Sequence, residues 1–298
     1  MPPRQLIGEL VADRPFATPD TIVLSGLQYL ASSRGTVLVL HGLGAFDSVA
    51  EASADALRRA TGFNVLFVDL RGNGRSGGAV GAVATTRQYV DDVATVVRDL
   101  KRRAPSGPVV LAGVQAGAGL ALRYVTEQGR DRAWPRVDGL VVADPILRPD
   151  SVQRFGTGDA GPSAWNDRRL AALTLLDRVG IHTFDTLPVL YQRVPTIHGA
   201  VVRRYSYASL RALEAPSGWR TDAQLPAPML WIVRAGSVDA KPQADDDAVL
   251  QLSATERWYH RAAMTALTRW SAQFSADAEM PAVILPYVPV PVKPPTPF

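Results

Sequence analysis

A strand-to-helix turn holds the first group that could take part in chemistry. The segment at 113–119 reads Gly-Val-Gln-Ala-Gly-Ala-Gly, so small residues stand two before and two after Gln115. Small residues at these positions allow a sharp turn that lifts one side chain above the sheet, beside a helix N-terminus. The amide of Gln115 cannot act as a nucleophile at neutral pH, nor can a base activate it as it activates a serine.

Three further candidates for chemistry each follow a short aliphatic run. They are His41, Asp144 and Asp239. Ligands collect at the carboxyl ends of the strands in open α/β sheets, where an imidazole and carboxylates could move protons. His41 could instead brace its loop through a hydrogen bond. Asp144 could belong to an ordinary strand-ending turn, and Asp239 could cap a turn or pair with an arginine.

Composition excludes several classes of chemistry. The chain has 298 residues and no cysteine, so disulfides, zinc–thiolate sites, iron–sulfur clusters and a cysteine nucleophile are all excluded. No phosphate loop of the G-x-x-x-x-G-K-[ST] type is present, and the dinucleotide fingerprint is not matched in a strand–turn–helix context. We therefore expect neither a cofactor nor a metal site.

The charge pattern and the apolar runs narrow the partners. The formal net charge is +4 and the basic residues are dispersed along the chain, which does not favour a nucleic-acid interface. No run approaches the length of a membrane span, and the first residues lack the apolar core of a signal peptide. These features predict a cytoplasmic protein with no membrane span and a small-molecule ligand. They indicate no particular oligomeric state.

The elements that must position the candidates alternate between strands and helices. Runs that are apolar on both faces predict buried strands, and apolar residues recurring every three or four positions predict helices. This alternation indicates crossover connections and a mostly parallel sheet, with an antiparallel hairpin at one edge. The expected strands are 36–40, 64–68, 109–111, 139–142, 229–233 and 282–285; the expected helices are 47–61, 86–103, 116–128 and about 244–275; and the hairpin comprises 7–12 and 21–29.

An inserted segment interrupts this alternation. Residues 145–222 contain a Leu-rich helical stretch, several prolines, Trp165 and Tyr191. Since the later strands need the same sheet, we expect one core over 1–144 and 223–298 with a largely helical cap over 145–222. A cap over a sheet edge commonly lines an apolar pocket, so we expect Trp165 and Tyr191 to contact a substrate.

Three segments together resemble the α/β-hydrolase family, especially its monoacylglycerol-lipase and lysophospholipase-like branch. The residues at 41–44 read His-Gly-Leu-Gly, like the family's H-G-x-G turn, and those at 69–76 read Asp-Leu-Arg-Gly-Asn-Gly-Arg-Ser, like its D-x-R-G-x-G-x-S loop. The turn at 113–119 stands where the family has G-x-S-x-G-G. The resemblance covers nearly the whole chain and implies an α/β-hydrolase fold, with a mostly parallel central sheet flanked by helices.

Two departures from the family pattern predict that Ser–His–Asp hydrolysis has been lost. Gln115 stands where the family has its nucleophilic serine, and the stretch after the expected last strand, 282–285, holds no histidine. Asp239 matches the family's acid position. The remaining histidines (His182 and His198 in the cap, and His260 in a late helix) are expected to be surface or structural groups. Gln115 is then either a polar relic or a group that binds substrate.

The anion-stabilising part of such a site can survive these losses. In the family, the backbone N–H after the nucleophile and one from the H-G-x-G turn bind an oxyanion, which by position are those of Ala116 and Leu43, with Gly42 beside them. Donors of this kind contribute roughly 3–4 kcal/mol each to transition-state stabilisation.

The resemblance and the departures lead to a functional hypothesis. We expect a cofactor-independent lyase, isomerase or cyclase that acts on an apolar carbonyl compound, with natural-product biosynthesis as one setting. A non-catalytic small-molecule binder or receptor is an alternative. A residual ester hydrolase with an atypical base, such as His41 or a histidine of the cap, is another.

Overall fold

The protein is described by a computed structural model that covers residues 11–31, 33, 35–44, 48–128, 134–146, 163–196, 199–216, 228–234, 248–252 and 257–274. An eight-stranded sheet forms its centre, in the order β1-β2-β4-β3-β5-β6-β10-β11. The strands are β1 Val11–Ala17, β2 Val23–Tyr29, β3 Thr36–Leu40, β4 Asn64–Val68, β5 Val109–Val114, β6 Gly139–Ala143, β10 Met229–Arg234 and β11 Ala248–Leu252.

Most of this sheet is parallel, as the alternating pattern predicts. All strand pairs from β4 to β11 run parallel, whereas β1 pairs antiparallel with β2, and β2 with β4. A hairpin therefore lies at one edge, as expected, but its first strand is β1 at 11–17 rather than 7–12. The carboxyl ends of the six parallel strands meet at one edge of the sheet, which we call the carboxyl edge.

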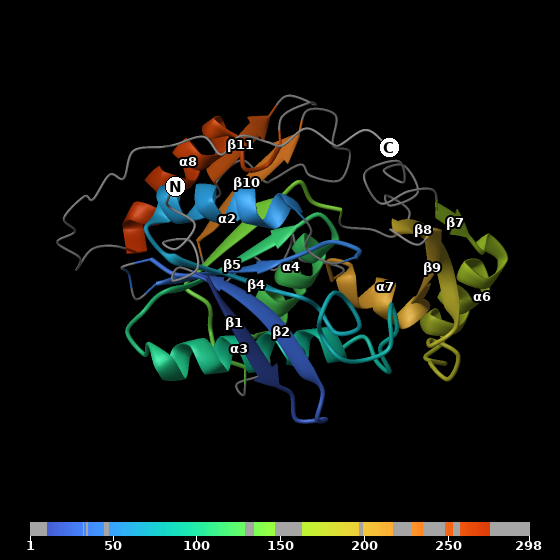
Figure 1. Ribbon diagram of the computed structural model, residues 1–298. Helices are drawn as coiled ribbons and strands as arrows, with labels where there is room; N and C mark the ends of the chain where they lie inside the picture. Colours follow the sequence, from blue (N-terminus) through green and yellow to red (C-terminus); the bar gives the residue numbers. More distant parts are fainter. Residues whose placement is uncertain are drawn as a thin grey trace.

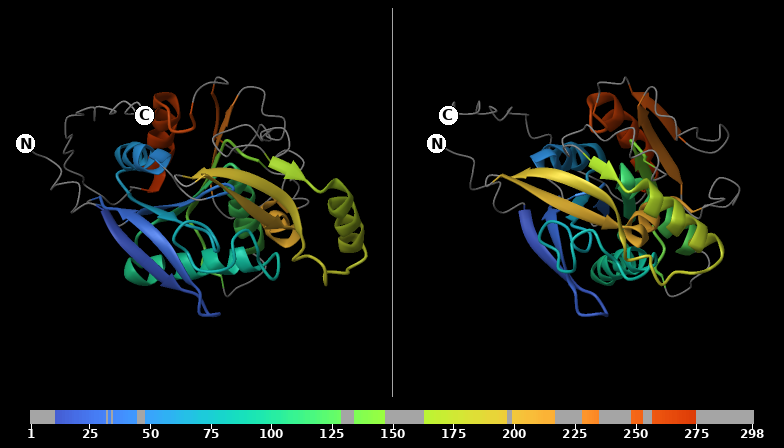
Figure 2. Two further views of the ribbon diagram at one scale, coloured as in Figure 1. Left: turned by 45° about the vertical axis from the view of Figure 1, so that its right-hand side comes forward. Right: turned by 90° about the vertical axis from the view of Figure 1, so that its right-hand side faces the viewer.

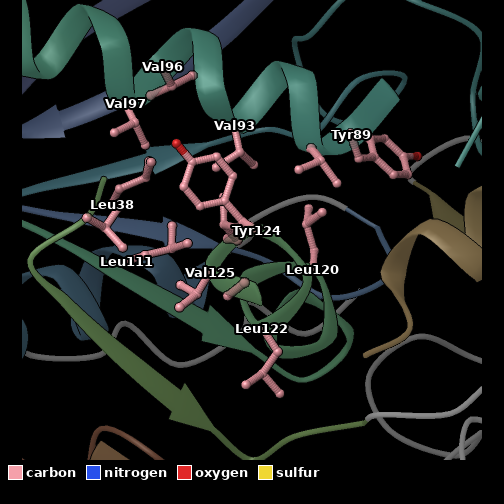
Figure 3. Close-up of a cluster of buried hydrophobic side chains, with 14 of the residues drawn as sticks. Leu38, Tyr89, Val93, Val96, Val97, Leu111, Leu120, Leu122, Tyr124 and Val125 are labelled. Carbon is pink, nitrogen blue, oxygen red and sulfur yellow. The ribbon is translucent and has the colours of Figure 1, made fainter. Parts of the chain in front are cut away.

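Helices cover both faces of the sheet (Figure 1). The helices α2 Ser48–Thr61 and α8 Arg261–Ser271, with a short 3-10 helix at Ala272–Phe274, lie on one face, and α3 Gln88–Arg103 and α4 Ala116–Gln128 lie on the other. Alternate residues of β3 divide between the two layers, with Leu38 on the α3–α4 side and Val37 on the α2–α8 side. Figure 3 shows the first layer, where Val93 and Val97 of α3 pack towards α4 and the strands.

The chain between β6 and β10 carries a second sheet rather than mainly helices. It has three antiparallel strands, β7 Ser163–Trp165, β8 Pro188–Thr196 and β9 Gly199–Ser206, together with α6 Asp167–Arg178 and α7 Tyr207–Leu213. The expectation of a largely helical cap is therefore wrong. The runs in β8 and β9 mix β-branched and aromatic residues with polar ones, a composition that fits a pleated strand with two different faces.

The last part of the core also differs from the expectation. The range 244–275 was expected to be helical, but it contains β11, which pairs parallel with β10 at the edge of the sheet, and then α8. The short aliphatic run at 248–252 (Ala-Val-Leu-Gln-Leu) suits an edge strand. The expected strand at 282–285 lies outside the described residues. None of the helices in the described part of the chain is long and apolar enough to span a membrane.

Candidate functional site

The predicted sharp turn lies between β5 and α4. Gln115 at its tip has φ 53° and an exposed side chain. The chain can turn so tightly because of its glycines: a Cβ added to Gly113 would lie 2.5 Å from the Cα of Ala118, and one added to Gly117 would lie 2.3 Å from the carbonyl oxygen of Leu40. Real Cβ atoms do not approach other atoms so closely, so glycine is required at both positions.

Backbone hydrogen bonds fix this elbow and leave its tip open. The Gln115 N–H donates to the carbonyl of Ala143, at 3.0 Å, and the Gln115 carbonyl accepts from the N–H of Ala118 and of Ile146, each at 3.1 Å. Ala116 begins α4, and amides in the first turn of a helix have no intrahelical acceptor. The elbow therefore presents one polar side chain and a helix N-terminus at the carboxyl edge.

The turn after β3 lies against this elbow. A Cβ added to Gly42 would stand 2.8 Å from the Gln115 side-chain Oε1 and 3.6 Å from the amide nitrogen of Ala116. Leu43, half-buried, packs against hydrophobic clusters of both the core and the cap. The structure therefore brings together Gly42, Gln115 and Ala116, with Leu43 next along the turn.

His41 braces this turn. Its Nδ1 donates to the carbonyl of Gly42 at 2.6 Å, and its Nε2 accepts from the Leu70 N–H at 2.8 Å. Because both ring nitrogens are bonded in this way, the imidazole is neutral. Burial, with a smaller contribution from the nearby charge of Arg203, outweighs the opposing effects of the Gly42 hydrogen bond and Asp69 and lowers the pKa of His41 to about 4. Of the two roles considered for His41, the geometry supports bracing rather than catalysis.

Asp144 also belongs to the carboxyl edge. It directly follows β6, has φ 46°, is half-buried, and its N–H donates to the carbonyl of Ile232 at 2.8 Å. Its neighbour Ala143 and Ile146, two residues on, both hydrogen-bond the Gln115 backbone. Asp144 is therefore held beside the elbow. Asp239, the other predicted carboxylate, lies outside the described residues.

A histidine follows the last strand of the described sheet, contrary to the expectation from the sequence. The eighth strand of the described sheet is β11, and His260 follows it as the N-cap residue of α8, with an exposed side chain. The statement that no histidine follows the last strand is therefore wrong for this sheet, because it depended on placing that strand at 282–285. His182 lies in the cap and is exposed, and His198 lies outside the described residues.

The two aromatic residues predicted to line the site lie on opposite faces of the cap sheet. Strand pairing places one set of side chains on the face that meets the core, which we call the inner face: Trp165, Leu190, Gln192, Arg203 and Tyr205. The indole N–H of Trp165 is buried there without a hydrogen-bond acceptor. Tyr191 lies on the other face, where its hydroxyl accepts from Arg169 of α6 at 3.2 Å. The structure does not bring Tyr191 to the elbow.

Arg203 is a site residue that the sequence reasoning missed. A Cβ added to Gly44 would lie 3.2 Å from its Nη1. The signal was available, because alternation along 201–205 separates Arg203 from Arg204, but the Arg203-Arg204 pair reads as surface charge when taken together.

Asp177, His182 and Asp185, in the cap, form the cluster within the described residues that has metal-ligand geometry. Their ligand atoms lie within 4.8 Å of one another. His182 Nδ1 is 3.4 Å from Asp177 and 3.1 Å from Asp185, and Arg211 is 3.3 Å from Asp177. These contacts account for the cluster without an ion, and it includes none of the residues at the elbow.

Comparison with known proteins agrees with this geometry. A family model described as serine aminopeptidase, S33, matches residues 31–269. Phospholipase YtpA of Bacillus subtilis (strain 168) is 30% identical over 89 residues, which are 30% of this chain and 32% of that protein, so the match spans about a third of the phospholipase.

Two solved structures share the fold. A soluble variant of monoglyceride lipase from Saccharomyces cerevisiae, in complex with a substrate analog, superposes with a TM-score of 0.60 at 13% identity, covering 89% of this chain and 94% of the lipase. Est1E from Butyrivibrio proteoclasticus, with ferulic acid bound, gives 0.54 at 13% identity, covering 87% and 96%. With its eight-stranded, mostly parallel sheet, the chain belongs to the serine aminopeptidase S33 family of the α/β-hydrolase fold.

Proposed function

We propose that this protein binds an apolar, carbonyl-containing small molecule at the Gln115 elbow and acts on it without a covalent acyl-enzyme. The observation that carries this proposal is the amide of Gln115, exposed at the tip of an elbow whose backbone is otherwise held in place. An amide can donate a hydrogen bond to a carbonyl oxygen, but it cannot attack the carbonyl carbon.

The carbonyl oxygen would lie at the backbone amides of Leu43 and Ala116. Gly42 lets this turn approach the elbow closely, since a Cβ there would lie 2.8 Å from the Gln115 Oε1 and 3.6 Å from the Ala116 nitrogen. Donors fixed in this way stabilise negative charge that develops on the oxygen, whichever bond then breaks. The apolar part of the ligand would lie towards Leu43 and Trp165.

This arrangement supports lyase, isomerase or cyclase chemistry. Such reactions need a stabilised enolate or oxyanion and a group that moves a proton, but no nucleophile. Asp144, held next to the elbow, is the described carboxylate best placed for proton transfer, and Asp239 stays a prediction. A tailoring step in natural-product biosynthesis is one reaction of this kind.

A second candidate is ester hydrolysis by directly activated water. It is favoured by His260, which follows the eighth strand, and by the relatives named as phospholipase and lipase. The base would be His260 rather than the buried His41 or the two histidines of the cap, His182 and His198. Water would attack the carbonyl in one step, again without an acyl-enzyme. A binder without catalysis would use the same amides.

One set of variants separates these candidates. Binding of 1-decanoylglycerol is measured by calorimetry, its products by mass spectrometry, and acyl-enzyme formation by labelling with a fluorophosphonate probe. We expect no labelling, and about tenfold weaker binding in Gln115→Ala, because one hydrogen bond to the carbonyl is lost. Covalent labelling or a burst of acylation in the unmodified protein would overturn the proposal.

The histidine variants decide between the two reaction classes. Release of decanoic acid that is lost in His260→Gln but kept in His182→Gln, its matched control in the cap, would establish the hydrolase. Rearrangement or elimination products without decanoic acid, from this or a related carbonyl compound, would support the main proposal. Binding with no product from any carbonyl compound would leave a receptor.

A further inference from the structure

The inner face of the cap sheet carries a polar group of side chains. Arg203 of β9 pairs with Gln192 of β8, and the positive charge of Arg203 lies near the hydroxyl of Tyr205. That hydroxyl donates to the Gln192 Oε1 at 3.2 Å. Tyr205 and Gln192 are only 2% and 6% exposed, so this group is built into the cap and does not belong to a mobile surface.

This polar group meets the core beside the proposed carbonyl site. Gly44 has no side chain, and the guanidinium of Arg203 occupies the space that a Cβ there would approach, to within 3.2 Å. Gly42, two residues earlier in the same turn, contacts Gln115. Two residues span at most about 7 Å of chain. Arg203 and Gln115 therefore flank the same short turn, one from the cap and one from the core.

Arg203 has no carboxylate partner among the described residues, although it is half-buried. Partly buried charges are normally paired, because removal from water disfavours an isolated ion. A guanidinium has five N–H donors, which is enough to bind both oxygens of a carboxylate or phosphate. Figures 1 and 2 show α6 on the side of the cap sheet away from the core, so the inner face, and with it Arg203, is turned towards the body of the molecule.

We propose that Arg203 binds an anionic group, a carboxylate or a phosphate, on the same small molecule whose carbonyl lies at the Gln115 elbow. This inference rests on the proposed function and adds a substrate class to it: apolar carbonyl compounds that carry a negative charge a short distance away. The fork of a guanidinium matches the two oxygens of either anion. Gln192 and Tyr205 orient the fork, and Gly44 leaves it room.

Arg204 provides a matched control. It is the next residue of β9, it has the same charge, and it lies exposed on the opposite face of the cap sheet. Two probe pairs test the carboxylate and phosphate sources separately. The first pairs the monomethyl with the dimethyl esters of C4 to C10 dicarboxylic acids, and the second pairs 1-decanoylglycerol 3-phosphate with 1-decanoylglycerol. Affinities are measured by calorimetry.

We expect the full-length protein to bind the anionic member of at least one pair about tenfold more tightly than the neutral member. Arg203→Met should reduce this preference to about twofold or less. Arg203→Lys should keep part of it, and Arg204→Met should keep all of it. The length of dicarboxylic ester that gains most then measures the span from the elbow to Arg203.

The response to Gln115→Ala tests carbonyl binding at the elbow, and the response to Arg203→Met tests anion binding separately. If the neutral and anionic probes bind equally, and both are weakened by Gln115→Ala, the elbow binds carbonyls and the role of Arg203 is wrong. If no probe binds, or Gln115→Ala weakens none, the proposed function is wrong. A preference that Arg204→Met removes as fully as Arg203→Met would show general surface attraction and would also overturn the inference. Circular dichroism confirms that each variant is folded.

Discussion

Two arginines approach the loops at the carboxyl edge in opposite ways. Arg71, in the loop after β4, is bidentate to Asp92 of α3, with Nη2 2.6 Å from Oδ1 and Nε 2.9 Å from Oδ2, and also pairs with Asp20. Arg203, on the inner face of the cap, has no carboxylate among the described residues. A position near the carboxyl edge therefore does not by itself make a cation a ligand-binding group. Arg71 has its charge matched within the fold, whereas the charge of Arg203 is left for a ligand.

His41 and Gln115 differ in a similar way, because the His41 side chain is bonded within the fold and the Gln115 side chain is exposed. Both ring nitrogens of His41 are bonded to backbone groups, and the side chain is 4% exposed. Gln115 lies against the same turn, but its side chain is exposed at the tip of the elbow. The carboxyl edge therefore consists of anchored groups, which hold the loops, and open groups, which face the space where a ligand would bind.

Replacing the anchored arginine should have the largest effect. Arg71→Met leaves the carboxylate of Asp92, whose side chain is 4% exposed, without its partner, and breaking a buried pair in this way costs about 3–5 kcal/mol. Burial already raises the pKa of Asp92 against the opposing effect of Arg71. Urea unfolding measures the loss.

Two other arginines test whether the contrast holds. Arg75→Met removes a pair with Asp13 whose side chains are 58% and 70% exposed, and should cost at most about 0.5 kcal/mol. Arg203→Met should change the free energy of unfolding by less than about 1 kcal/mol, since no carboxylate of the described residues loses a partner. A cost for Arg203→Met equal to that for Arg71→Met would erase the distinction between an anchored and an open arginine.

Lowering the pH should reduce the free energy of unfolding, because His41 is buried in its neutral form. Its pKa in the folded protein is about 4, below the ordinary 6.5, so the unfolded chain takes up a proton first as pH falls. The stability contributed by neutral His41 is complete above pH 6.5 and is lost between pH 6.5 and 4. At about 1.4 kcal/mol for each pKa unit, the total loss is about 3 kcal/mol.

The comparison of variants isolates this titration. His41→Gln should flatten the slope of unfolding free energy between pH 6.5 and 4. The Arg71 and Thr18 hydrogen bonds hold the pKa of Asp20 below its ordinary 3.8, so that group titrates outside this window. An unchanged slope in His41→Gln would mean that His41 is not a buried neutral group.

The core could be read from the sequence because its strands are buried on both faces. The ranges 36–40 and 64–68 match β3 and β4, and 116–128 matches α4. Such runs depend little on tertiary context. The β8–β9 hairpin and β11 were missed because half-exposed strands carry a mixed pattern whose faces become distinct only against a partner. Because the last strand was expected at 282–285, the sequence did not indicate that His260 follows a strand of the sheet, as it does after β11.

The residues of the candidate site also fall into two groups, those that the sequence predicts and those that need the structure. Gln115, Gly42 and Ala116 were predictable, because small residues around a strand end dictate the backbone of the turn. Arg203 and the true side of Tyr191 were not, because each depends on the register of β8 with β9, which local sequence does not determine. The role of His41 also needed the structure, since Leu70, which bonds its Nε2, is 29 residues away in the chain.

Relieving the backbone at the open glutamine should have a small effect on stability, with the opposite sign. Gln115 has φ 53°, a region that is unfavourable for residues with a Cβ, so Gln115→Gly should raise the free energy of unfolding by about 0.5–1 kcal/mol. Thr21, with φ 67°, lies in the β1–β2 connection, and Thr21→Gly should give a similar gain. Only Gln115→Gly should weaken binding of 1-decanoylglycerol, because only it removes the donor to the carbonyl. A gain in stability that comes with a loss of binding would mean that Gln115 is held in its conformation for the ligand. If Gln115→Gly bound as well as the unmodified protein, the amide would be a relic of the lost nucleophile and not part of a working site.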